Sequence, residues 1–133
     1  MNKFQGHISE INTRGNFSVI TVTVNNKIKL KSIVIDTPES ATYISSDRIV
    51  NVVFKETEVI LSTDKLPAIS LLNRIPGTIS EIEAGELLSR VVLCTDIGPV
   101  ISVISTLAVY ELDLTVGCDI MAMIKLNEII LSK

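Results

Sequence analysis

Two kinds of residue in this chain have types and positions that suit chemistry: paired hydroxyls in a short motif and lysines inside apolar runs. Residues 37–41, Thr-Pro-Glu-Ser-Ala, place two hydroxyls around an expected helix start, with Thr37 as the N-cap. Lys55 and Lys125 recur at matched places. Hydroxyls and backbone N–H groups at a helix start are hydrogen-bond donors, and a lysine adds positive charge, so together they are able to contact an anion. A simpler interpretation stays open for each group: the hydroxyls only cap a helix, and the lysines only protect edge strands from aggregation.

Residue patterns typical of catalysis or metal binding are not visible. His7 is the only histidine, and Cys94 and Cys118 form no Cys-x-x-Cys pair. No carboxylate dyad, nucleophile–base pair or phosphate-binding glycine loop occurs, and Gly6 and Gly77 fit the interior of strands better. We therefore expect no enzyme activity, no metal ligands, no organic cofactor, and two buried, inert thiols.

The elements that must position these residues come from a tandem repeat. Residues 2–11 return as residues 73–82, and residues 55–62 return as residues 125–132. A unit of this size buries only about 60% of its unfolded surface when alone. We therefore expect two domains, residues 1–64 and 70–133, that depend on each other or on further subunits, with function at the seams between them.

Composition favours burial at subunit interfaces and argues against nucleic acid or membrane partners. Hydrophobic residues make up 47% of the 133-residue chain, whose mean hydropathy is +0.45. No apolar stretch is long enough to span a bilayer, and polar residues follow Met1 where a signal peptide would lie, so we expect a cytoplasmic protein. The net charge of −3 divides into about +1 for residues 1–65 and about −4 for residues 66–133, without the basic excess of nucleic-acid-binding proteins.

Strand signals dominate both units. Residues 17–24 alternate apolar and hydroxyl side chains, and Asn25-Asn26-Lys27 predicts a hairpin turn, because Asn tolerates positive φ. The remaining strands are expected at 28–35, 49–54, 58–61, 75–82, 87–95, 100–104, 119–124 and 128–131, with short helices from residue 37 and near 106–112. The second unit's hairpin is expected to be three residues shorter and its loop after the helix two residues longer. This order predicts an all-β protein of two tandem OB-like five-stranded barrels, each with one short helix.

The motifs resemble those of the Mop domain, also called TOBE, a molybdate-binding module. Its pattern has an Asn-x-x-x-Gly opening, Thr-x-Glu-Ser-Ala at the helix, and Ile-Lys-x-x-x-Val-x-Leu at the end. Both units carry versions of the opening and closing motifs, whereas the helix motif is complete only at residues 37–41. Two tandem units resemble the di-Mop molbindins, which are trimers that bind molybdate or tungstate inside the cell, between Mop units.

The resemblance implies which residues hold the anion. The family uses hydroxyls, backbone amides at the short helix, the closing lysine and a Ser-Ala-Arg-Asn opening, which correspond here to Thr37, Ser40, Ala41, Lys55, Ser70, Asn73, Ser105 and Lys125. Asn73 can instead tie down its strand by backbone hydrogen bonds. This sequence departs from the family at Leu72, which replaces the arginine, and at Leu107-Ala108-Val109. Each lost charged donor removes about 1.5–3 kcal/mol of hydrogen bonding.

We expect an oxyanion-binding protein for storage, homeostasis or sensing of molybdate or tungstate, assembled as a homotrimer. The alternative is a regulatory or protein-interaction module, similar to the effector domain of a molybdate-responsive regulator, whose ligand sites have weakened. A third interpretation, a single-strand nucleic-acid OB module, rests on Lys27, Lys29 and Lys31 along one strand face. The aromatic content of 4% and the charge oppose it.

Overall fold

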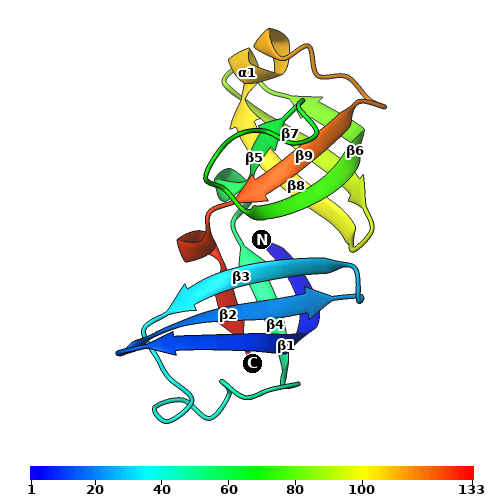
Figure 1. Ribbon diagram of the computed structural model, residues 1–133. Helices are drawn as coiled ribbons and strands as arrows, with labels where there is room; N and C mark the ends of the chain where they lie inside the picture. The colour runs from blue at the N-terminus through cyan, green and yellow to red at the C-terminus, as the bar shows by residue number, and fades with distance from the viewer.

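The computed structural model describes all 133 residues and contains two five-stranded antiparallel sheets, one for each half of the chain (Figure 1). The first half contributes β1 (Asn2–Arg14), β2 (Phe17–Val24), β3 (Ile28–Val34), β4 (Ile49–Phe54), the 3₁₀ helix η1 (Glu56–Glu58) and β5 (Ile60–Ser62). The second half contributes β6 (Asn73–Ala84), β7 (Leu88–Thr95), β8 (Gly98–Ser105), α1 (Thr106–Glu111), β9 (Asp119–Ile124), the 3₁₀ helix η2 (Leu126–Glu128) and β10 (Ile130–Ser132). The predicted all-β class is confirmed, with one α-helix where two were expected.

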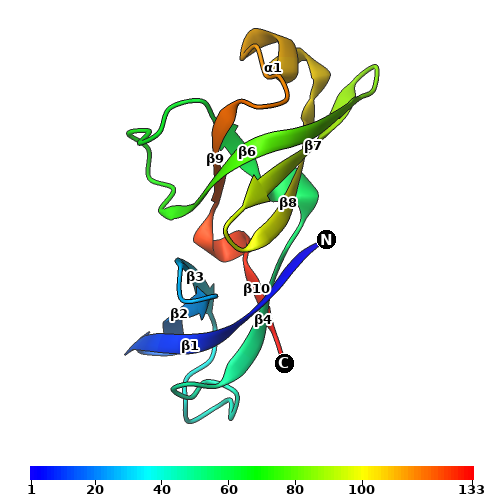
Figure 2. The ribbon, with the colours of Figure 1, turned by 90° about the vertical axis from the view of Figure 1, so that its right-hand side faces the viewer.

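The closing strands are exchanged between the two halves. The sheet orders are β10-β4-β1-β2-β3 and β5-β9-β6-β7-β8. Ile130 of β10 lies opposite Val53 of β4, and Ile60 of β5 lies opposite Met123 of β9. Figure 2 shows β10 beside β4, within the half to which it does not belong in sequence. The expected domains 1–64 and 70–133 therefore describe the repeat in sequence. In the structure, each sheet also contains one strand from the other range, β10 in the first sheet and β5 in the second.

The hydrophobic core is continuous across the two halves. A cluster of 24 buried residues draws on both sheets, as the alternation of apolar residues on the strands requires. The rings of Phe4 and Phe54 stack with centroids 5.9 Å apart in the first half, and Gly98 of the second half lies against the Phe4 ring. Because the core is shared, each half stabilises the other.

Gly6 and Gly77 occupy matched positions where neighbouring strands leave no room for a side chain. A Cβ on Gly6 would lie 2.6 Å from the carbonyl oxygen of Thr23, and one on Gly77 would lie 2.9 Å from that of Cys94. The strand register slips at Ser9 and at its counterpart in β6, as expected of a bulge that curls each sheet. Both glycines are strand features, as predicted.

The hairpin turns agree with the sequence in type but not fully in length. Asn25 and Asn26 have φ values of 53° and 56°, which confirms the asparagine turn between β2 and β3. In the second half Thr95 pairs with Gly98, so the hairpin is one residue shorter than in the first half, rather than three. The sequence comparison assigned a difference of three residues to the hairpin. The other two of these residues, Ile35 and Asp36, lie between the end of β3 and Thr37.

The helix expected from Thr37 forms only as consecutive turns. The Ala41 N–H donates to the Thr37 carbonyl at 3.0 Å, but no helix continues from this bond. The spacing explains the difference. Asp47 and Gly117 are equivalent positions at which the chain rejoins its sheet, since their N–H groups donate to the carbonyls of Ile8 and Ile79 at 2.8 Å. Asp47 follows its N-cap by ten residues and Gly117 follows Ser105 by twelve, so the first half has too little chain for a helix and a return.

The strand exchange predicts that residues 1–65 alone do not form a folded monomer, because nothing fills the place of β10 beside β4. The fragment should be unfolded, or dimeric with each β5 completing the partner's sheet, as the repeat similarity permits. Far-UV circular dichroism and light scattering, with the full chain as control, distinguish these states. A folded monomeric fragment would show that the exchange is dispensable.

Candidate anion-binding site

The eight residues implicated by sequence lie in three separate regions of the chain. Thr37, Ser40 and Ala41 lie on the turn between β3 and β4 at one end of the molecule, whereas Ser105 caps α1 at the opposite end (Figure 1). Lys55 and Lys125 precede the 3₁₀ helices that lead into the exchanged strands, Asn73 begins β6 and is bonded to β3 of the other half, and Ser70 lies in the linker just before it. A single chain therefore does not bring the hydroxyl motifs and the lysines together.

The first-half turn is held by reciprocal contacts between Thr37 and Ser40. The Thr37 N–H donates to Ser40 Oγ at 2.8 Å, and the Ser40 N–H donates to Thr37 Oγ1 at 3.3 Å, in the manner of a capping box. The Ser40 hydroxyl in turn donates to Asp36 Oδ1 at 3.2 Å. Ser40 is exposed. These bonds hold a turn and not a helix, so the hydroxyls make cap-type contacts without the helix that was expected, and an anion role for them stays a prediction.

The second-half turn offers fewer exposed hydroxyls. Ser105 Oγ accepts the Ala108 N–H at 3.1 Å, which makes it the N-cap of α1. Ala108 follows its N-cap by three residues, as Ser40 follows Thr37, so the second hydroxyl is absent. Thr106 is buried, and its hydroxyl is engaged with Gly85 O at 2.9 Å and Ser89 Oγ at 2.8 Å. Of the two hydroxyls at the start of α1, only Ser105 is available to a ligand.

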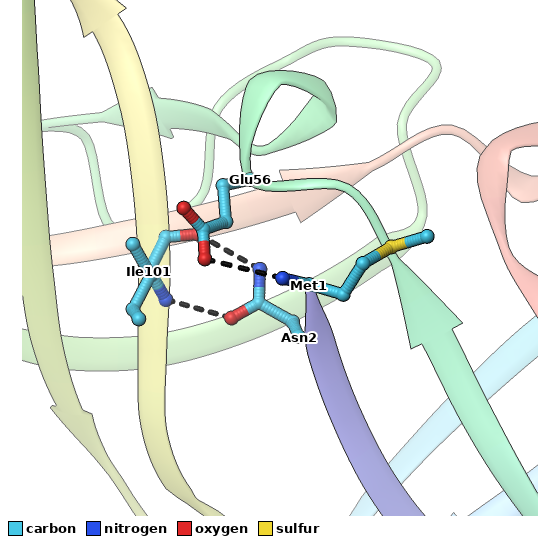
Figure 3. A network of polar contacts seen from close by, with 4 residues as sticks. All are labelled: Met1, Asn2, Glu56 and Ile101. Atoms are coloured by element: carbon cyan, nitrogen blue, oxygen red, sulfur yellow. Dashed lines mark hydrogen bonds and ion pairs between the residues drawn. The ribbon is translucent and has the colours of Figure 1, made fainter.

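Asn73 and its repeat partner Asn2 join the two halves. Asn73 Oδ1 accepts the Lys31 N–H and its Nδ2 donates to the Lys31 carbonyl, both at 2.8 Å. Asn2 makes the same pair of bonds with Ile101, also at 2.8 Å (Figure 3). Each asparagine is 4% exposed, and its side chain pairs with backbone N–H and carbonyl groups on the outer edge of β3 or β8. The predicted backbone contacts of Asn73 are therefore present, and their partner is the edge strand of the other half.

Two buried serines, which the sequence reasoning missed, repeat this arrangement. Ser32 Oγ donates to the Ile129 carbonyl at 2.6 Å, and Ser102 Oγ donates to the Val59 carbonyl at 2.8 Å. These bonds attach each edge strand to the closing segment of the other half, and thereby close each barrel. The available signal was a serine recurring at an offset of 70 residues.

Lys55 and Lys125 lie directly before the 3₁₀ helices that lead into the exchanged strands. Their carbonyls accept the N–H groups of Glu58 and Glu128 at 3.0 and 2.9 Å, which fixes the backbone at both positions. Both side chains are exposed. The only ion pair in the chain joins the Met1 amine to Glu56 Oε2 at 3.3 Å (Figure 3), so neither lysine has an acidic partner. Two free ammonium groups are thus held at the junction.

Arg74 does not replace the arginine missing at Leu72. Its guanidinium donates to the carbonyls of Leu71 and Pro67 at 2.8 Å and to that of Ile69 at 3.1 Å, and so fixes the linker before β6. Leu72 is 79% exposed. The Ser70 hydroxyl is exposed and has no hydrogen bond within the chain. The opening motif of the second half therefore presents a hydroxyl and an apolar side chain instead of a cation.

A cavity at the start of the second half contains none of the predicted residues. It has a volume of about 470 Å³ and lies in the second half, where Asp64, Asp96 and Asp119 line it. Three carboxylates against one lysine, Lys65, make this cavity unfavourable for an anion. Cys94 also lines it and is exposed, so the prediction of a buried thiol is wrong for Cys94, whose position on β7 faces away from the core.

Similarity to known proteins supports the fold and the motifs. The TOBE domain family matches residues 69–131. The whole chain matches a crystal structure of ModG, with a TM-score of 0.89 and 30% identity over 98% of this chain and 94% of that one. The chain belongs to the TOBE family. The solved ModG structure is that of a cytoplasmic molybdate-binding protein with molybdate bound.

A second solved structure similar to this TOBE chain is MopII from Clostridium pasteurianum. The identity is 29% over 44% of this chain and 88% of that one, with a TM-score of 0.42. No protein of curated function matches the sequence. No helix of this TOBE chain is long and apolar enough to cross a membrane.

The two hydrogen bonds between the Asn73 side chain and the Lys31 backbone predict that Asn73→Ala lowers the stability of the TOBE chain. It leaves the Lys31 N–H and carbonyl without partners, and each buried unsatisfied group costs about 1–3 kcal/mol. Urea unfolding should show a loss of free energy of unfolding of about 2–6 kcal/mol for the two groups together. Asn12→Ala, at an exposed position of β1, is the matched control. Equal stability of the two variants would contradict the structural role of Asn73.

Proposed function

We propose that this protein binds molybdate or tungstate in the cytoplasm, for storage, homeostasis or sensing. The observation that carries the proposal is its similarity to molybdate-bound ModG over 98% of the chain. The first-half turn adds support, because Thr37 and Ser40 keep the hydroxyls that such a site needs and the backbone N–H groups of the turn hold these hydroxyls in place. A tetrahedral dianion is well matched to hydroxyl and N–H donors.

The site is completed between chains. Within one chain the hydroxyl turns and the free ammonium groups of Lys55 and Lys125 lie in different regions, although a dianion benefits from both. A second chain that places its junction against the first chain's turn supplies the missing charge. Exposed apolar residues in these regions, among them Ile35 at 76% and Leu107 at 67%, are suited to burial between chains. We propose a homotrimer as this assembly.

The two halves bind unequally in this proposal. Thr37 and Ser40 provide two hydroxyls, whereas Ser105 stands alone because Thr106 faces the core. Loss of the arginine at Leu72 weakens the second half further. We expect the first-half turn to form the stronger site, with about one tightly bound anion per chain.

One observation favours the alternative of a regulatory or protein-interaction module with weakened ligand binding. The cation expected at Leu72 is missing, and the nearby Arg74 guanidinium is engaged by three carbonyls. In that case the exposed apolar surface serves a protein partner.

Thermal melting with molybdate, tungstate, sulfate and phosphate separates the two functions. A ligand at 100 times its Kd stabilises the folded protein by about 2.7 kcal/mol, which raises the melting temperature by several degrees. We expect an increase with molybdate and tungstate at millimolar concentration. The absence of an increase with any of the four anions would refute the binding function and favour the alternative.

Replacing the junction lysines tests their role. Lys55→Ala and Lys125→Ala should each weaken molybdate binding by roughly ten- to a hundredfold, because each removes a charged donor. Isothermal titration calorimetry measures the affinity, and light scattering should show the same trimer for each variant. Lys27→Ala, in the β2–β3 turn, is the matched control. Unchanged affinity in both junction variants would exclude these lysines from the site.

A further inference from the structure

We propose that Asp36 controls which anions the first-half turn accepts, by holding the Ser40 hydroxyl and by opposing doubly charged ligands. This inference rests on the proposed function, because it concerns the same site. It predicts a site that discriminates by ligand charge as well as by shape.

The carboxylate of Asp36 competes directly with a ligand for the Ser40 proton. The Ser40 hydroxyl has one hydrogen, which lies within reach of Asp36 Oδ1 at 3.2 Å and of the Thr37 carbonyl at 3.3 Å. Its lone pairs meanwhile accept the Thr37 N–H. An anion that takes the Ser40 hydrogen must therefore replace its hydrogen bond to the carboxylate, which stays beside the turn as a charge of the same sign.

The backbone of Asp36 is anchored, so the carboxylate remains next to the turn. The Asp36 carbonyl accepts a hydrogen bond from Ser18 Oγ at 2.7 Å, and Ser18 is fully buried in β2 and bonded to Thr13 Oγ1 at 2.9 Å. Asp36 is one of the two residues inserted between β3 and Thr37. The second half lacks this insertion and therefore has no acidic group before its own N-cap, Ser105.

The charges around the turn leave Asp36 without a counterion. It forms no ion pair, and neither does Arg48, the one cationic residue between β3 and β4. The C-terminal Lys133 is engaged nearby, with its Nζ 5.9 Å from the centre of the Tyr43 ring. Burial first, and then the negative charge of Asp36, raise the pKa of the Tyr43 hydroxyl above its ordinary value. The negative charge of Asp36 therefore acts on a second group of the same loop, the Tyr43 hydroxyl.

The expected effect follows from distance and charge. A ligand oxygen bonded to Ser40 places the anion about 6 Å from the carboxylate, given the 3.2 Å contact between Ser40 and Asp36. In water, a unit charge at about 6 Å weakens binding of a monoanion about threefold and of a dianion about tenfold. Perrhenate and molybdate are tetrahedral oxyanions of charge −1 and −2. A comparison of their affinities therefore distinguishes the effect of ligand charge from the effect of ligand shape.

The test uses Asp36→Asn, which removes the charge but keeps an oxygen that accepts the Ser40 hydroxyl. Calorimetric titration of the full chain at low ionic strength should show molybdate affinity rising about tenfold and perrhenate affinity about threefold. Asp47→Asn is the matched control, since Asp47 lies in the same loop, its carboxylate forms no hydrogen bond or ion pair, and its φ of 63° is one that Asn tolerates. It should leave both affinities within about twofold of the wild type.

The outcomes distinguish this inference from the proposed function. If the wild type binds molybdate and Asp36→Asn binds it equally, or if Asp47→Asn has the same effect as Asp36→Asn, the role of Asp36 is overturned and the binding function stands. If the wild type and both variants bind neither anion, the proposed function fails together with the inference.

Discussion

The exchange of β5 and β10 is the constraint on which the rest of the structure depends, because neither sheet is complete without a strand from the other half. The buried polar contacts follow from it. Once the closing segments cross, the outer edges of β3 and β8 face the opposite half, and their backbone groups need partners there. Asn73 and Asn2 supply those partners, and Ser32 and Ser102 attach the same edges to the crossing segments. The result is a pseudo-symmetric junction without an unsatisfied buried side chain.

The same crossing decides where the charged and polar groups of the binding site lie. Lys55 and Lys125 precede the crossing segments, so both ammonium groups are at the junction, while the hydroxyl turns are at the two distal ends. In the proposed function, an anion site that uses both the hydroxyls and the lysines therefore requires the association of chains. Oligomer formation and ligand binding are then linked, because any ligand that bridges chains stabilises the assembly. The two-residue insertion that brings Asp36 to Ser40 makes the two ends of the chain unequal.

Much of the fold is encoded locally and could be predicted from the sequence. Period-two alternation placed the long strands, and the Asn25-Asn26 turn was predicted from the tolerance of asparagine for positive φ. The strand exchange was not predictable in this way. Residues 60–62 and 130–132 are both Ile-Leu-Ser, so either segment fits beside β4 or β9, and only the path of the chain decides between them.

The site was predictable only in part, for related reasons. The capping role of Thr37 and Ser40 follows from their spacing, but the absence of a helix depends on the distance to Asp47, which is a tertiary constraint. The contact between Asp36 and Ser40 depends on where β3 ends. The strand pairing shows that Ile35 and Asp36 follow β3, whereas comparison of the two sequence repeats assigned these extra residues to the hairpin.

The most direct test of a site shared between chains is X-ray diffraction from crystals grown with molybdate, using the anomalous signal of molybdenum to locate the ligand. We expect a peak where the Thr37–Ser40 turn of one chain faces Lys55 or Lys125 of another. A peak bound wholly within one chain, or in the cavity lined by Asp96 and Asp119, would contradict this arrangement.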